Sequence, residues 1–87
     1  MAEKDLKNIE KIIKALADES RIRIICLLKS KSSLCVCEIQ GIIGLSQPTI
    51  SSHLKILENA GLIEFTKDGL WVNYKIKANL NSFEIFC

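Results

Sequence analysis

The chain has 87 residues, of which 48% are hydrophobic and 25% charged, and its formal net charge at pH 7 is +2. This length suits one small domain over residues 1–87, of the size that a partner subunit often stabilises. No apolar run reaches membrane-spanning length, and the charged start MAEKDLKNIEK lacks a signal-peptide core. The sequence therefore predicts a cytoplasmic protein without a membrane partner, whose 4 cysteines are reduced.

The N-terminal part of the chain contains two stretches that predict helices. Residues 4–17 place Leu6, Ile9 and Ile13 on one stripe at helical spacing, which indicates an amphipathic first helix. Asp18 follows as a typical N-cap residue, so we expect a second helix with an apolar inner face to begin there.

The stretch Leu34–Gln40, with the sequence LCVCEIQ, predicts the start of a third helix that ends near Gly41 and Gly44. Each residue of a regular helix turns about 100°, so Cys35 and Cys37 are expected to point roughly 200° apart. Two thiols that diverge in this way could hold one ion only if the first helical turn were distorted.

A fourth helix with a polar outer face is expected next. Ser46 is placed to cap it, Pro48 lies in the first turn, where a missing N–H costs little, and Gly61 marks its end. His53 borders the apolar stripe, so it packs or caps as readily as it contacts DNA, and it is a further candidate for DNA binding. The polar positions, which are candidates for DNA contact or simply for solvation, are Ser46, Gln47, Thr49, Ser51, Ser52 and Lys55.

After the fourth helix the apolar period changes from helical to alternating. Residues 68–69, Asp-Gly between apolar runs, predict a two-residue hairpin turn. That turn would pair Phe65 with Val72 and Ile63 with Tyr74, with all four side chains on one face. The last residues, NLNSFEIFC, predict a short final helix.

This order of elements predicts a mainly α fold with a small β-hairpin, the winged helix-turn-helix. That fold favours DNA binding, with Lys67 and Lys75 on the wing as candidate phosphate contacts. A winged helix that binds only other proteins stays open. An enzyme is the weakest interpretation, because the sequence shows no nucleophile–base pairing, no Gly-rich phosphate loop and no carboxylate pair with an evident role.

Three stretches of the chain resemble the ArsR/SmtB family of metal-responsive repressors: ALADESRIRIICLL, LCVCEIQGIIGLSQPTISSHLKILENAGLIEF and KDGLWVNYKI. The resemblance implies a homodimer that binds double-stranded operator DNA and releases it when a toxic metal or metalloid binds. Surplus apolar residues on so small a chain also favour a two-fold dimer. The expected interface residues are Leu6, Ile9, Ile13 and Phe83.

The pair Cys35 and Cys37 resembles the arsenic and antimony site of this family, and thiolates favour such soft ions. Arsenic-sensing relatives often carry a third cysteine three residues after the second, where this sequence has Gln40. The resemblance therefore implies an As(III) or Sb(III) inducer and no constitutive cofactor. The third thiol would come from Cys26, Cys87 or the partner chain, or the pair would bind with two ligands.

Other sensors of the family fit less well. Cadmium and lead sensors add cysteines from the N-terminal segment, and this chain has none before Cys26. Zinc sensors place Asp and His ligands on the last helix, and NLNSFEIFC has no histidine. A regulator that responds to thiol oxidation stays open, as does a constitutive DNA binder without a working metal site.

Overall fold

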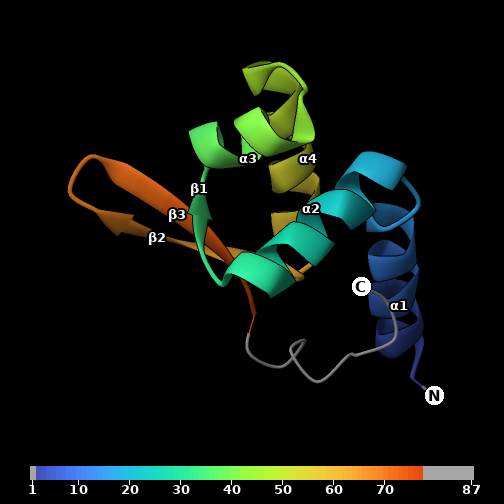
Figure 1. Cartoon of the computed structure of the whole chain (residues 1–87). Coiled ribbons are helices and arrows are strands. Elements are labelled where there is room, and N and C mark those ends of the chain that lie inside the picture. The colour runs from blue at the N-terminus through green and yellow to red at the C-terminus, as the bar shows by residue number, and fades with distance from the viewer. Residues whose placement is uncertain (1, 78–87) are drawn as a thin grey trace.

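The computed structural model describes residues 2–77, in which four helices and a three-stranded antiparallel sheet form a winged helix-turn-helix (Figure 1). The predicted fold class is confirmed. The expected final helix and Phe83 lie outside the described residues. The elements are α1 (Glu3–Ala15), α2 (Glu19–Lys31), β1 (Leu34–Cys35), α3 (Val36–Ile43), α4 (Gln47–Asn59), β2 (Ile63–Asp68) and β3 (Trp71–Ile76). Among these elements, no helix combines the length and the apolar character that a membrane crossing needs.

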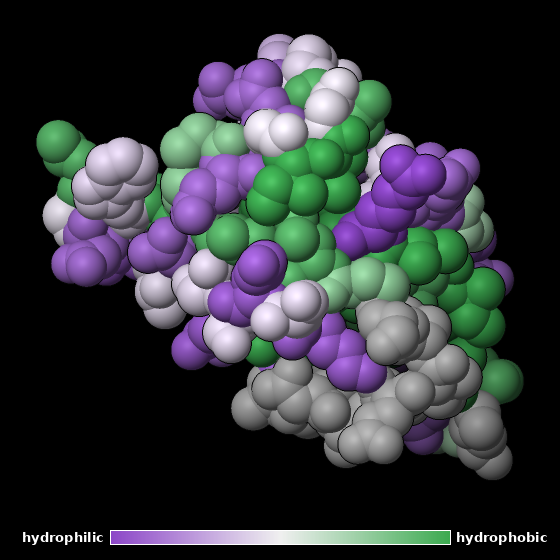
Figure 2. Space-filling view, in the orientation of Figure 1, coloured by the Kyte–Doolittle hydropathy of each residue, from purple (hydrophilic) through white to green (hydrophobic). Residues whose placement is uncertain are grey.

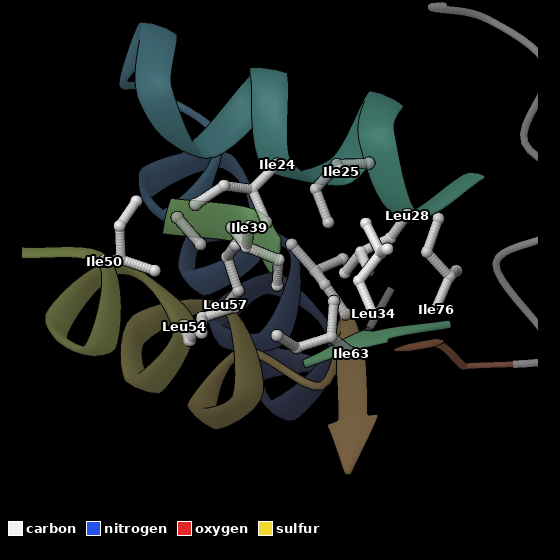
Figure 3. Packing of buried hydrophobic residues seen from close by; sticks show 12 residues of the cluster. Ile24, Ile25, Leu28, Leu34, Ile39, Ile50, Leu54, Leu57, Ile63 and Ile76 are labelled. Atoms are coloured by element: carbon white, nitrogen blue, oxygen red, sulfur yellow. The ribbon is translucent and has the colours of Figure 1, made fainter. Parts of the chain in front are cut away.

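The core lies between α2, α3, α4 and the base of the sheet, where their apolar side chains point toward one another (Figure 3). Ile24, Ile39 and Ile63 come from three different elements and are completely buried. Burial of one such side chain contributes about 1.5–3 kcal/mol, so this cluster holds the helix-turn-helix against the sheet. Ile50 and Leu57 anchor α4 to the same cluster.

Local signals at the helix ends behave as the sequence predicts. The Asp18 carboxylate accepts the backbone N–H of Arg21 at 3.1 Å, which caps α2. At the end of α4, Gly61 has a φ of +78° and donates its N–H to Glu58 O at 2.9 Å. The N–H of Leu62 reaches Leu57 O at 3.1 Å, which completes a Schellman motif and turns the chain into β2.

The hairpin turn lies one residue later than predicted. Asp68 pairs with Trp71 across the hairpin, so Gly69 and Leu70 are the central turn residues. Gly69 has a φ of +64°, whereas Leu70 has no positive φ, a combination typical of a type II′ turn. The predicted turn would have placed Asp68 at a position where a type I′ turn requires a positive φ, which costs a residue with a Cβ more than glycine.

The predicted strand register is therefore wrong by two residues, although the division into faces is confirmed. Phe65 pairs with Tyr74 rather than Val72, and Ile63 pairs with Ile76 rather than Tyr74. The Phe65 and Tyr74 rings lie with centroids 5.9 Å apart, a favourable aromatic cross-strand contact. Because side chains alternate with a period of two, a shift of two residues leaves each of them on its predicted face.

A short strand, β1, was not predicted. Leu34 pairs with Tyr74 and Cys35 with Asn73, which places β1 beside β3 at the edge of the sheet. The interpretation of LCVCEIQ as helical from its start is wrong for these first two residues, since α3 begins at Val36. Two residues are too few to show the alternation by which a strand is recognised, and the pairing partner lies far along the chain.

Candidate nucleic-acid interface and thiol site

A tight connection between α3 and α4 sets the position of the candidate recognition helix. Gly44 has a φ of +85° and donates its N–H to Gln40 O at 2.8 Å, so α3 ends there. Ser46 then forms the N-cap of α4 with an extended backbone, and Pro48 lies in the first turn as predicted. The Ser46 and Thr49 hydroxyls are 2.9 Å apart and hydrogen-bonded.

The outer face of α4 carries the polar side chains that the sequence singled out. The inner positions Ile50, Leu54 and Leu57 are buried, which fixes the direction in which the opposite face points. Exposed on the remaining surface of α4 and its cap are Ser46, Gln47, Thr49, Ser51, Ser52 and Lys55. This row of hydroxyl, amide and ammonium groups matches the donors and acceptors that read base edges and bind phosphates.

His53 lies on the inner edge of α4, apart from that exposed row. Its side chain is only 15% exposed, and its Nδ1 lies 3.3 Å from Nη1 of Arg21. Nε of Arg21 also donates to Ala15 O at 2.7 Å, while His53 Nε2 lies 4.0 Å from the Asp18 carboxylate. This contact network joins α4 to the end of α1 and the start of α2. The structure therefore favours the packing alternative for His53 over a DNA contact.

Arg21 is a residue that sequence reasoning missed. Its partners include His53, 32 residues away in sequence, and the carbonyls of Ala15 and Lys14. Nothing in the local pattern indicates such long-range pairing. A lone histidine at the border of an apolar stripe was the only signal in the sequence for a partly buried polar contact at the inner edge of α4.

The wing carries two of the candidate phosphate contacts on opposite faces. Lys67 is exposed and lies across from Val72 on the face shared with Phe65. Lys75 lies on the other face, with its Nζ 3.7 Å from the Glu64 carboxylate. An exposed ion pair of this kind is weak, so it leaves the Lys75 ammonium available to a phosphate.

The thiol pair differs most from expectation. Cys35 belongs to β1 and is the N-cap of α3, with φ −84° and ψ 167°, while Cys37 lies in the first turn of the helix. The extended backbone at Cys35 turns its side chain toward Cys37, and the two sulfurs lie 2.9 Å apart. The predicted divergence of the thiols is therefore wrong. Both thiols are free, Cys35 is buried, and Cys37 is exposed.

Glu38 ties the thiol pair to the helix end. Its Oε1 accepts the backbone N–H of Cys35 at 3.0 Å. In return, the Cys35 side chain accepts the backbone N–H of Glu38, so the two residues form a capping box. The hydrogen bond from Cys35 lowers the pKa of the Glu38 carboxyl. The hydrogen bond with the Cys37 sulfur raises the pKa of the Cys35 thiol, so this cysteine is protonated at neutral pH.

The spacing of the two sulfurs is close to that of a chelating pair. Two sulfurs that each lie about 2.3 Å from one ion are roughly 3.3–3.8 Å apart for bond angles of about 90–110°. From 2.9 Å, the pair needs to open by less than about 1 Å, which side-chain rotation supplies. Within residues 2–77 there is no group of three His, Cys, Asp or Glu side chains that could hold a metal ion.

The apolar stripe of α1 is exposed in the single chain. Leu6, Ile9 and Ile13 are 54%, 42% and 62% exposed, whereas Ala15 at the end of the helix is buried. The C-terminal end of α1 is thus fixed to the domain at Ala15, while its apolar stripe has no cover within residues 2–77. This is the surface that the sequence assigned to a dimer interface.

Residues 18–64 match the family model described as "Bacterial regulatory protein, arsR family". The chain belongs to this family. Among curated ArsR-type relatives, the arsenical resistance operon repressor of Escherichia coli (strain K12) is 41% identical over 69 residues, 79% of this chain and 59% of the repressor. The cadmium resistance transcriptional regulatory protein CadC homolog of Staphylococcus aureus is 36% identical over 76 residues, 87% of this chain and 63% of that protein.

The chain spans about three fifths of the length of these two relatives. Both are regulators of transcription rather than enzymes, which agrees with the sequence interpretation. Among solved structures, HlyU from Vibrio cholerae N16961 has a TM-score of 0.81 at 31% identity, covering 92% of this chain and 87% of that one. The homodimeric winged helix-turn-helix DNA-binding domain Mb0332 from Mycobacterium bovis has a TM-score of 0.83 at 26% identity, covering 93% and 77%.

Proposed function

We propose that this ArsR-family chain is a homodimeric, cytoplasmic repressor that binds operator DNA and releases it when As(III) or Sb(III) binds Cys35 and Cys37. The observation that carries the DNA-binding part is the exposed polar face of α4, presented by a helix whose opposite side is buried in the core. The observation that carries the inducer part is the 2.9 Å contact between two free thiols at the start of α3.

In this proposal α4 lies in the major groove. Gln47 and Ser51 contact base edges, and Lys55 contacts the backbone, since amide and hydroxyl groups discriminate bases while ammonium groups bind any phosphate. Lys67 and Lys75 add phosphate contacts from the wing. The remaining exposed candidates on this surface are Ser46, Thr49 and Ser52.

Dimerisation through α1 would place two copies of α4 on one duplex. The exposed stripe of Leu6, Ile9 and Ile13 supplies an apolar surface that a second copy can cover by two-fold symmetry. The Mb0332 domain is named as a homodimer, which supports this arrangement. Two α4 helices related by a two-fold axis would read two half-sites about one helical turn apart.

In this proposal the thiol site affects both of the elements that contact DNA. Cys35 caps α3, the helix that leads into α4, and it also pairs with Asn73 in the wing strand β3. A metalloid bound to both sulfurs reorients the Cys35 side chain, which disturbs the capping box with Glu38 and the end of the β1–β3 pairing. Unlike a divergent pair, these thiols can bind without prior unwinding of the helix.

The proposal is tested by selecting duplexes from a random pool with the reduced protein, then measuring affinity with arsenite, antimonite, cadmium or zinc. Arsenite and antimonite should lower the affinity most, and Cys35→Ser/Cys37→Ser should bind the same duplex without responding to either. Serine at position 35 retains a good N-cap, so this variant separates ligation from helix capping. Wild-type protein that holds the duplex unchanged through saturating arsenite and antimonite would contradict the inducer assignment.

A second candidate function, control by thiol oxidation, is favoured by the same 2.9 Å contact. Two thiols this close can lose two electrons and two protons to hydrogen peroxide and form a disulfide, with two water molecules as the other product. Cys35 lies in extended backbone, so the strain expected for a pair within a helix is smaller here. Loss of DNA binding with peroxide but not with arsenite would identify this function in place of metalloid sensing.

A further inference from the structure

The hairpin turn at the far end of the wing carries apolar side chains, and these side chains take no part in the DNA contacts proposed above. Leu70 is 100% exposed and Trp71 is 62% exposed, and both lie at the hairpin turn. The hairpin projects away from the helices, and its end carries apolar surface (Figures 1 and 2). A type II′ turn accepts polar residues at its second central position, so the turn itself gives no reason for a leucine there.

Neither side chain belongs to the core that residues 2–77 form. Leu70 and Trp71 are absent from the core cluster and from the apolar residues packed against it. Trp71 lies across from Asp68, on the polar face of the sheet with Thr66 and Asn73. The hairpin also projects on the side of the molecule away from α1, so a dimer formed through α1 leaves it uncovered (Figure 1).

A cation beside the tip, on the face of the wing opposite Asp68 and Trp71, favours DNA as its partner. Lys67 is exposed and, within residues 2–77, makes no ion pair. It lies next to Asp68, the residue that precedes the turn, and hence beside the apolar tip. Architectural proteins that bind the minor groove combine Lys or Arg side chains with apolar side chains that enter between base steps.

The wing is also long enough to reach such a groove. β2 and β3 have 6 residues each, and strands of that length extend about 20 Å. The major groove is about 12 Å wide, so a hairpin projecting beside a helix in that groove can pass one phosphate backbone and meet the next minor groove. The base of β2 follows directly from α4 through the Schellman motif at Gly61, which makes the tip continuous with the proposed recognition surface.

We propose that Leu70 and Trp71 form an apolar wedge that enters the minor groove of operator DNA, with Lys67 on an adjacent phosphate. Insertion partly unstacks one base step and bends the duplex, by roughly 20–90° for wedges of this kind. The wedge therefore selects easily unstacked pyrimidine–purine steps at a position that α4 never touches. This inference rests on the proposed DNA binding by α4.

The chain contains its own fluorescent probe, because Trp71 is the single tryptophan of its sequence. A duplex selected from a random pool is added to the reduced dimer while indole emission and its quenching by acrylamide are recorded. Stacking against a base should quench the emission and protect the indole from acrylamide. Donor and acceptor dyes on the duplex ends report the bend in the same complex.

Leu70→Ser is the test variant and Thr66→Ser, an exposed residue of the same hairpin, is the matched control. Leu70→Ser should lower affinity by roughly five- to tenfold, reduce the bend and relax the preference for a pyrimidine–purine step. Thr66→Ser should leave all three unchanged.

Four results overturn the wedge. Saturation of the wild-type dimer with unchanged emission and acrylamide access, or an equal bend with Leu70→Ser, overturns the wedge alone. Weaker self-association of Leu70→Ser without DNA, with the bend unchanged, assigns the tip to a second copy instead. A wild-type dimer that selects no duplex overturns the proposed function and the wedge with it.

Discussion

The two helices of the helix-turn-helix begin in chemically different ways. α4 begins at Ser46, whose hydroxyl is hydrogen-bonded to that of Thr49, and the first residues of the helix, Gln47, Pro48 and Thr49, are exposed. α3 begins at Cys35, whose sulfur touches a second free thiol and whose N–H is held by Glu38. The start of α4 is thus constant under changing solution chemistry, whereas the start of α3 is built from groups that ligands, oxidants and pH can change.

The proposed roles of the two helices differ accordingly: α4 contacts DNA, and α3 responds to a ligand. A helix that reads bases must hold one position, which for α4 the buried side chains and the His53–Arg21 contact provide. A helix that responds to a ligand must have two arrangements of similar energy. For α3, the Cys35 cap provides them, because a ligand bound to the sulfur can displace it.

The largest expected effect follows from removing packing beneath the start of α4. Ile50 is completely buried, so Ile50→Ala should lower the free energy of unfolding by about 2–5 kcal/mol. Ile56 lies on the same helix at 38% exposure and is the matched control, with an expected change within about 0.5 kcal/mol. Urea denaturation at one fixed protein concentration measures both, since a dimer's apparent stability depends on concentration. Equal losses would mean that packing does not fix α4.

The next effect concerns what α4 reads. Gln47→Ala and Ser51→Ala should each relax base preference by about 1–3 kcal/mol at one position of the selected duplex. Lys67→Ala should instead weaken binding to every duplex and flatten its salt dependence. Competition binding against single-base variants at several salt concentrations separates the two classes. If neither class changes DNA binding, the winged helix serves a protein partner instead.

The pH dependence of stability should distinguish the two helix starts further. Because the Cys35 N–H lowers the pKa of Glu38 in the folded chain, the carboxylate stabilises the fold above its unfolded pKa. That contribution is lost as pH falls through the lowered folded pKa. Glu38→Gln should remove this part of the acid sensitivity, while Asp18→Asn removes the separate part from the cap of α2. Thermal unfolding across the acidic range measures both, and an unchanged pH profile for Glu38→Gln would remove Glu38 from the cap.

A smaller effect concerns how pH changes ligand affinity at the thiols. The raised pKa of Cys35 keeps this thiol protonated near neutral pH. Cadmium must displace those protons, so its affinity should rise between about pH 6.5 and 8.5. Arsenous acid exchanges hydroxide for thiol and releases water, so its affinity should stay nearly constant over the same range. Calorimetric titration at several pH values measures both, and parallel profiles would contradict binding of both ligands through these thiols.

The sequence predicts the parts of this molecule that depend on local pattern. Helical spacing gave the four helices, and capping residues such as Asp18 and Gly61 gave their ends. The exposed row on α4 follows from the burial of Ile50 and its neighbours, although its contact with DNA stays a proposal. Cys35 and Cys37 were identified from their residue type and from the family resemblance.

Long-range pairing is what the sequence did not reveal. Cys35 is extended because it pairs with Asn73 across the sheet, and this pairing turns its sulfur toward Cys37. The contact of Arg21 with His53 likewise joins residues far apart in the chain. Local propensity favours a helix through CVCEIQ, and the sheet overrides it at the first cysteine.

Reciprocal linkage between DNA and metalloid binding shows whether the thiol cap of α3 controls α4 and the wing. The dissociation constant of arsenite is measured for the reduced dimer alone and for the dimer saturated with its selected duplex, with Cys35→Ser/Cys37→Ser as the blank. If the thiol cap of α3 controls α4 and the wing, DNA should weaken arsenite binding by the same factor by which arsenite weakens DNA binding. Arsenite that binds Cys35 and Cys37 with equal affinity in the free and the DNA-bound dimer would contradict this account.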